Sequence, residues 1–174
     1  MSVRKPLLVL FMAALVSVSL VGAIDLSAYW VDSDGANWEN AVAAGTDSDG
    51  AALYVIRALN KDQSSLVPGK YNPLTDTAYV CYGGAEVVVN NFEVLVLPPK
   101  IAKRCQWVHA SDTSDGDAVV GGYDSDGSDL FVIAADYKSA QMVPGKYNPN
   151  HDKAYIPYGG KEIAVKDFYF LVAK

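Results

Sequence analysis

The sequence predicts an all-β protein made of two tandem antiparallel repeats, related by an approximate twofold axis and packed in a sandwich-like arrangement. The string VPGKYNP occurs twice, at 67–73 and 143–149, and an internal duplication sets the architecture before any local interpretation. Short apolar runs rich in β-branched and aromatic residues alternate with clusters of Gly, Pro, Asn and Asp, as in antiparallel sheets. No window shows a sustained helical period.

Further motifs recur in the same order and mark the limits of each repeat. Both repeats open on Trp-Val, then carry GxDSDG before VPGKYNP and AY(V/I)xYGGxE after it. We assign 24–97 to the first repeat, 98–105 to a linker and 106–174 to the second repeat. Repeats of this size are marginal alone, so we expect them to pack as one unit, with Trp30 and Trp107 in the core.

Residues 1–23 have the pattern of a signal peptide. Arg4 and Lys5 precede an apolar run, and Val21-Gly22-Ala23 supplies the small residues that favour cleavage after Ala23. A retained membrane anchor is the alternative, because the run approaches spanning length. The signal peptide is favoured, and it predicts a secreted, extracellular protein.

Charge and cysteine content limit the partners. The formal net charge of −6 argues against nucleic acid, whose binding depends on phosphate neutralisation, and against anionic lipid and membrane insertion. Cys81 and Cys105 lie at non-equivalent repeat positions. In an oxidising compartment they would form one bridge between the first repeat and the linker; two buried or free thiols are the alternative.

The duplicated Asp-Ser-Asp-Gly strings predict tight turns. Asp bonds to its own backbone and Gly takes a positive φ. Alternating oxygen ligands before a glycine suggest calcium, but the strings at 47–50 and 124–127 lack the further ligands of an EF-hand loop. We therefore predict no metal site and no cofactor.

An acid and a lysine are duplicated without an evident structural reason. Pro-Gly in each PGK string predicts a turn, but the lysines that follow, Lys70 and Lys146, need no turn role. The first acids of the DSDG strings, Asp47 and Asp124, are duplicated too. A carboxylate accepts hydrogen bonds from neighbouring hydroxyls and an ammonium donates to the same diol, so each Asp–Lys pair predicts a small carbohydrate-binding site. Simple inheritance of surface charges is the alternative.

Other duplicated residues leave their roles open. Glu86 and Glu162 follow the YGG turns and either complete the sites or pair with a lysine. Tyrosines at 71, 82, 147 and 158 suit either a sugar face or a half-buried strand. His109 and His151 are not duplicated and have no nucleophile context, so we predict a protein that is not an enzyme.

The order Trp-Val, A-x-A-G-x-D-x-D-G, L-Y-V, P-G-K, Y-x-x-Y-G-G-x-E and an aromatic with E-V-L-V resembles the DM-nine (DM9) repeat family, which includes natterin-like lectins. The resemblance covers residues 28–173. It implies a β-rich fold of two repeats, often a homodimer, that binds mannose-type sugars on microbial or host surfaces in innate immunity. The sugar-contacting positions of the family are matched by Asp47, Lys70, Asp124 and Lys146. A protein-interaction scaffold and a remnant of a natterin-like pore-forming toxin are the alternatives.

Departures from the family pattern fall around these positions. The lysine of Y-G-G-K-E is Lys161 in the second repeat but Ala85 in the first. The arginine that often follows L-Y-V is Arg57 in the first repeat but Ala134 in the second. These changes leave both Asp–Lys pairs intact and predict pocket walls that differ between the repeats.

Overall fold

The computed structural model describes residues 24–174, and the predicted signal peptide, residues 1–23, lies outside them. The first repeat contributes β1 (Trp30–Asp32), β2 (Ala43–Thr46), β3 (Ala52–Leu59), β4 (Leu66–Asn72), β5 (Thr77–Tyr82), β6 (Ala85–Val89) and β7 (Glu93–Leu95). The second contributes β8 (Cys105–His109), β9 (Val120–Tyr123), β10 (Asp129–Tyr137), β11 (Ala140–Asn148), β12 (Lys153–Tyr158), β13 (Lys161–Val165) and β14 (Tyr169–Ala173).

The all-β prediction is confirmed. Helical structure among the described residues is confined to α1 (Pro99–Ala102), in the predicted linker, and to 3-10 turns at Ser27–Tyr29, Ser33–Gly35, Trp38–Asn40 and Asp115–Asp117. No helix within residues 24–174 is long and apolar enough to cross a membrane.

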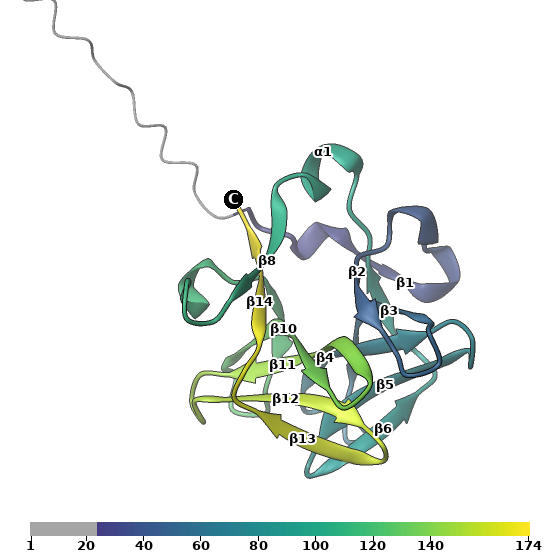
Figure 1. Ribbon diagram of the computed structural model, residues 1–174, viewed down its shortest axis with the longest axis vertical. Helices are drawn as coiled ribbons and strands as arrows, with labels where there is room; N and C mark the ends of the chain where they lie inside the picture. The colour runs from purple at the N-terminus through teal and green to yellow at the C-terminus, as the bar shows by residue number, and fades with distance from the viewer. Residues whose placement is uncertain (1–23) are drawn as a thin grey trace, which may run out of the picture.

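The strands form one continuous antiparallel sheet that closes on itself, in place of the expected sandwich-like pair. Its order is β1-β7-β3-β2-β11-β12-β13-β6-β5-β4-β9-β10-β14-β8, and the additional pairings β3–β4 and β11–β10 close rings within it. Each pairing in one repeat has its counterpart in the other, as an approximate twofold requires. The repeats are joined where β2 meets β11, β4 meets β9 and β6 meets β13, so strands of both repeats lie interleaved (Figure 1).

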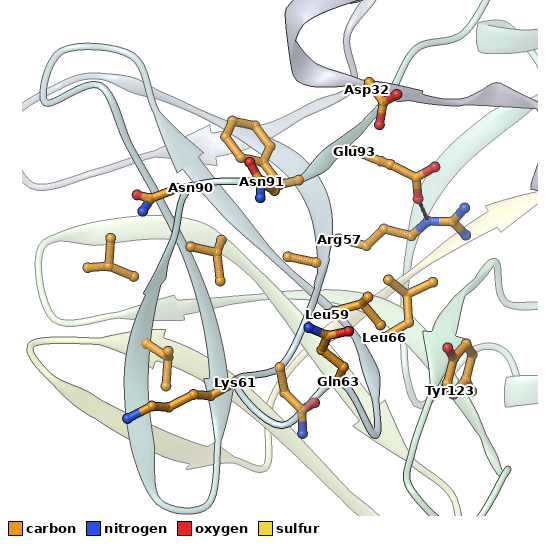
Figure 2. Close-up of a pocket in the computed structure, with 16 residues that line it drawn as sticks. Asp32, Arg57, Leu59, Lys61, Gln63, Leu66, Asn90, Asn91, Glu93 and Tyr123 are labelled. Carbon is orange, nitrogen blue, oxygen red and sulfur yellow. Dashed lines mark hydrogen bonds and ion pairs between the residues drawn. The ribbon is translucent and has the colours of Figure 1, made fainter.

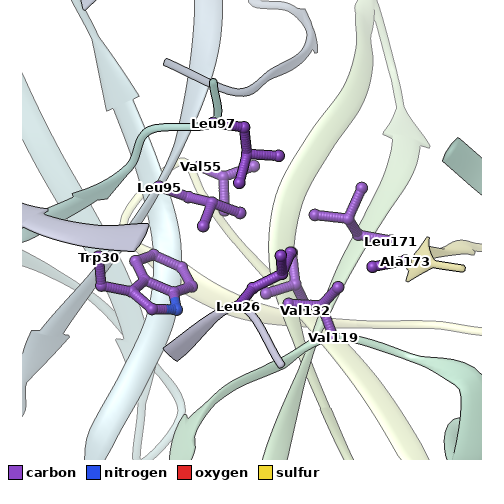
Figure 3. Close-up of a cluster of buried hydrophobic side chains, with 9 residues drawn as sticks. All are labelled: Leu26, Trp30, Val55, Leu95, Leu97, Val119, Val132, Leu171 and Ala173. Atoms are coloured by element: carbon purple, nitrogen blue, oxygen red, sulfur yellow. The ribbon is translucent and has the colours of Figure 1, made fainter. Parts of the chain in front are cut away.

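The hydrophobic core is shared between the repeats. One cluster joins Trp30, Leu95 and Leu97 of the first repeat to Val132 and Leu171 of the second (Figure 3). Trp30 is buried there and Trp107 packs against the cluster, as the sequence predicts. Burial of each large aliphatic side chain stabilises the fold by about 1.5–3 kcal/mol, and much of that energy therefore depends on contact between the two halves.

Two leucines at equivalent positions exchange partners between the repeats. Leu53 of the first repeat packs in a cluster formed otherwise by second-repeat residues, and Leu130 of the second packs in a first-repeat cluster. Both side chains are fully buried. The two repeats are thus one folding unit, and the two ends of the described part of the chain, residues 24–174, lie side by side: the amide of Ile24 donates to the carbonyl of Ala173.

The two cysteines are free thiols, so the alternative of unbridged thiols describes this structure. Cys81 is buried in β5, and Cys105 is partly buried at the start of β8. Burial raises the pKa of the Cys81 thiol well above its ordinary value, although the ammonium of Lys146 opposes the shift. A buried thiol of this kind stays protonated and unreactive at neutral pH.

Candidate functional site

The duplicated lysines lie in β4 and β11, where the PGK strings form strand and not the predicted turn. The reason is a close approach of neighbouring strands. A Cβ at Gly69 would lie 2.1 Å from the carbonyl oxygen of Tyr79, and one at Gly145 would lie 2.1 Å from that of Tyr155. Glycine is needed here to let the strands pack, and the lysine that follows is held at a fixed place on the strand.

Each lysine forms a buried ion pair with the glutamate of its own repeat. Lys70 Nζ lies 3.1 Å from Glu86 Oε1, and Lys146 Nζ lies 2.9 Å from Glu162 Oε1. Lys70 and Lys146 are 3% and 5% exposed. Of the two roles left open for the glutamates, the structure shows pairing with a lysine in both repeats. Because a lone buried charge is strongly destabilising, each partner requires the other.

The second oxygen of each glutamate bonds to the opposite repeat. Glu86 Oε2 accepts a hydrogen bond of 2.7 Å from the amide of Gly160, and Glu162 Oε2 accepts one of 2.8 Å from the amide of Gly84. These glycines belong to the YGG turns and have φ of 81° and 87°, a conformation that glycine adopts without strain. Each ion pair is therefore anchored by a turn of the other half of the molecule.

Tyrosines of both repeats surround each ammonium. Lys70 Nζ lies 5.2 Å from the ring centroid of Tyr79 and 5.0 Å from that of Tyr158. The equivalent distances for Lys146 Nζ are 5.7 Å to Tyr155 and 5.1 Å to Tyr82. These are cation–π distances, and in each case one ring comes from the same repeat and one from the other.

The duplicated acids lie in tight turns, as the sequence predicts. Gly50 and Gly127 have φ of 85° and 83°. Asp47 Oδ1 accepts from the amide of Ser48 at 2.7 Å, and Asp124 Oδ1 accepts from the amide of Ser125 at 2.7 Å. Among residues 24–174 no group of three or more His, Cys, Asp or Glu side chains is placed to hold a metal ion.

Two buried asparagines connect these turns to the lysine strands. Asn72 Nδ2 donates to Asp47 Oδ2 at 3.2 Å, and Asn148 Nδ2 donates to Asp124 Oδ2 at 2.8 Å. Each asparagine follows its lysine by two positions, and alternate residues of a strand share one face. The asparagine therefore holds the acid on the same face as the ammonium.

In the second repeat this arrangement opens as a hollow of about 360 Å³. Asp124, Lys146 and Glu162 line it together with Tyr82 of the first repeat and with His151. The structure thus brings the predicted Asp124–Lys146 pair to one cavity. In the first repeat, Asp47 and Lys70 are related through Asn72 in the same way, with Tyr158 of the second repeat over the ammonium.

Sequence reasoning missed three residues that position the acids. Asn72 and Asn148 belong to the duplicated VPGKYNP string, so the duplication itself was the signal for them. Ser65 is buried, and its hydroxyl donates to Asp124 Oδ1 at 3.1 Å across the repeat boundary. Only the folded arrangement reveals that contact, because the two residues are far apart in sequence. The hydroxyl of Ser65 also helps to hold the pKa of Tyr82 below its ordinary value.

A serine, a histidine and an aspartate meet outside the hollows, near the ends of β8 and β14. His109 Nε2 lies 2.6 Å from Asp167 Oδ1, and His109 Nδ1 lies 2.7 Å from Ser111 Oγ. The Asp167 side chain is 88% exposed, whereas the acid of a serine-hydrolase triad is buried so that it fixes the imidazole. The arrangement is that of a surface hydrogen-bond network.

A family model, the DM9 repeat, matches residues 47–165. The chain belongs to the DM9 repeat family. The resemblance seen in the sequence is thereby confirmed, and membership of the DM9 family points to a carbohydrate-binding, lectin-like fold.

Among solved structures, the DM9 protein is similar to the nematode sperm cell motility protein MFP2B, with a TM-score of 0.55 at 16% sequence identity. The match covers 76% of this chain and 43% of that chain, so this chain spans less than half of the neighbour's length. At this identity the likeness concerns the fold alone. No curated protein matches the chain in sequence.

Proposed function

We propose that this DM9 protein is a secreted, non-enzymatic lectin that binds mannose-type sugars, in recognition of glycans on microbial or host surfaces. The observation that carries the proposal is the duplicated arrangement of an acid, an ammonium and two tyrosines, which in the second repeat lines one hollow. Family membership supports it. The fold supplies the site with both hydrogen-bonding chemistry and aromatic surface.

The groups in the second hollow suit a pair of neighbouring sugar hydroxyls. Lys146 Nζ donates to Glu162 and, at 2.8 Å, to the carbonyl oxygen of Cys81, so one of its three N–H groups is left for a ligand. The Asp124 carboxylate has lone pairs that its neighbours do not use, and these can accept hydrogen bonds from a sugar hydroxyl. The Tyr82 ring offers an apolar face for a pyranose.

Such a small polar site binds weakly, because water competes for every hydrogen bond. We expect dissociation constants on the order of 0.1–1 mM for a monosaccharide. Two sites per chain, doubled by assembly as a homodimer, would raise the avidity on a glycan-coated surface by about a hundredfold or more.

Retention on mannose resin tests the proposal. The double variant Asp47→Asn with Asp124→Asn removes both acid charges while keeping an acceptor for Asn72 and Asn148, and we expect it to lose retention. The matched control, Asp112→Asn with Asp167→Asn, removes two exposed acids outside the hollow and is expected to be retained like the unaltered protein. Undiminished retention of the first variant would show that the acids do not bind sugar. Failure of the unaltered protein to bind any glycan on an array would favour the protein-interaction scaffold.

A further inference from the structure

A large groove on the first repeat is not used by the proposed sites. Its volume is about 970 Å³. The loop between β3 and β4, residues 60–65, forms one side, and the turn between β6 and β7, residues 90–92, forms another (Figure 2). It shares Arg57, Leu66 and Tyr123 with a neighbouring hollow of about 720 Å³. The groove therefore continues past Arg57 and suits an extended ligand.

A preorganised ion pair lies at the junction of the two hollows. Arg57 Nε lies 2.6 Å from Glu93 Oε2, and the guanidinium lies 4.6 Å from the ring centroid of Trp30. The Arg57 side chain is 17% exposed, and among residues 24–174 its terminal amino groups find no hydrogen-bond partner. Fixed donors thus stand beside a carboxylate acceptor, the combination that the Lys–Glu pairs present in the two proposed sugar sites.

The scaffold itself does not require this ion pair. Arg57 and Glu93 face each other in the pairing of β3 with β7, and the equivalent positions of β10 and β14 are Ala134 and Tyr169. The second repeat folds in the same way without the charges. A charged pair that is absent from one of two otherwise equivalent repeats, and that lines a large groove, points to a role in binding.

The rest of the groove combines side-chain amides with apolar surface. Gln63, Asn90 and Asn91 are exposed and line the groove. Leu59, Val88 and Tyr123 lie among them, with 43%, 58% and 43% of their surfaces exposed. Amides bond to hydroxyls in both directions, and apolar side chains cover the C–H face of a sugar ring.

We propose that this groove binds an internal stretch of a neutral oligosaccharide, at a third site separate from the two proposed Asp–Lys sites. The charges of its lining balance, because Arg57 and Lys61 face Asp32 and Glu93, and the acidic chain as a whole disfavours an anionic ligand. The inference rests on the proposed lectin function and extends it. The two can be tested separately, because the groove can fail to bind sugar while the Asp–Lys sites bind it, or the reverse.

A peptide would use the groove differently. β6 pairs with β5 along its length and meets β13 at Ala85 alone, so an added peptide strand would bond to the backbone of residues 87–89. It would leave the side-chain amides and the Arg57–Glu93 pair largely unengaged. Because several polar side chains line the groove, a sugar is favoured over a peptide as its ligand.

Nuclear magnetic resonance of the ¹⁵N-labelled protein tests the groove directly, since the amide groups of Gln63, Asn90 and Asn91 and the Arg57 Nε–H each give a signal. The probes are linear pentasaccharides of mannose, of glucose and of N-acetylglucosamine, and a tryptic digest of casein. We expect at least one pentasaccharide to shift these signals, and to do so equally in the Asp47→Asn, Asp124→Asn double variant. That result would show that the groove binds sugar independently of the two Asp–Lys sites.

Two variants then measure the contribution of the groove. Arg57→Gln and Asn90→Ala should each weaken binding of the same pentasaccharide about tenfold, the loss that corresponds to one or two hydrogen bonds. Lys166→Ala, at the exposed position equivalent to Asn90 in the second repeat, is the matched control and should leave binding unchanged. Groove signals that move with the casein digest but with none of the sugars would overturn the proposal, as would shifts confined to residues of the hollows.

Discussion

The two candidate sites share their buried ion pairs and differ in the contacts around those pairs. Both hold a lysine against a glutamate that is anchored by a glycine amide of the other repeat. Around the second, Ser65 bonds to Asp124 and the carbonyl of Cys81 bonds to Lys146. Around the first, Lys138 and Tyr137 lie beside Tyr158, with Lys138 Nζ 6.0 Å from the Tyr158 ring centroid.

This difference separates what the fold requires from what each site can change. A buried ion pair cannot lose one partner without a large cost, so it is the same in both halves. The contacts around the ion pair are single hydrogen bonds and ring contacts, so each can differ at a smaller cost, about 1 kcal/mol. The two sites therefore present the same central donors and acceptors in different surroundings, which predicts a common sugar type with different preferences for the residues next to that sugar.

The largest expected effect comes from removing either buried ammonium. Lys70→Met and Lys146→Met each leave a glutamate with about a tenth of its side chain exposed and no cation beside it. We expect each to lower the free energy of unfolding by about 3–5 kcal/mol. The second should cost about 1 kcal/mol more, because the Cys81 carbonyl also loses its donor.

Urea denaturation measures both changes. Lys161→Met is the control, since Lys161 is exposed and next in sequence to Glu162; it should change the stability by no more than about 0.5 kcal/mol. A loss below about 1 kcal/mol for Lys70→Met and Lys146→Met would mean that the glutamates are solvated and that the common core of the two sites is not held by burial.

A smaller effect should be confined to one half. Ser65→Ala removes the hydroxyl that bonds to Asp124 and should cost about 1 kcal/mol of stability. It should also weaken mannose binding at the second hollow but not at the first. A mannose titration that follows the backbone amides of Gly83 and Gly159, which sit at equivalent turn positions, separates the two sites. Equal weakening of mannose binding at both sites would contradict the independence of the two sites. The control is Ser139→Ala, in the exposed turn between β10 and β11.

The smallest effect should be the same in both halves. Burial, followed by the hydrogen bond that the hydroxyl donates to Asp76 or Asp152, raises the pKa of Tyr71 and of Tyr147 to about 12. Because the pKa is raised above the unfolded value of about 10, the stabilisation is complete below pH 10 and is lost as the pH rises toward 12.

Tyrosinate absorbance during an alkaline titration measures these pKa values. Asp76→Asn and Asp152→Asn should lower the pKa of the bonded tyrosine by similar amounts, since the hydrogen bonds are 2.8 Å and 2.9 Å long. Unequal changes in the two tyrosine pKa values would show that the two halves also differ away from the contacts around the ion pairs.

The sequence supported the repeats, the strands and the choice of Asp47, Lys70, Asp124 and Lys146 as residues to follow, because duplication marks positions held in both copies. It did not reveal the pairings β2–β11, β4–β9 and β6–β13, which depend on contacts between distant segments. From sequence alone the Pro-Gly pair predicts a turn, and the prediction is wrong because the close approach of Tyr79 to Gly69 exists only after folding. Ser65 and Glu93 lack a duplicate, so the sequence gave no signal for them. Arg57 stood out only as a difference between the repeats, and its pairing with Glu93 is visible only in the folded protein.

The bond from each glutamate to a glycine of the opposite turn has a consequence for how the two copies evolve. A substitution in one YGG turn disturbs the ion pair that belongs to the other copy. Selection on either pocket therefore acts on both segments of the gene. The copies are free to diverge along their entrances, but neither can be discarded or transferred to another protein without damage to the pocket that stays behind.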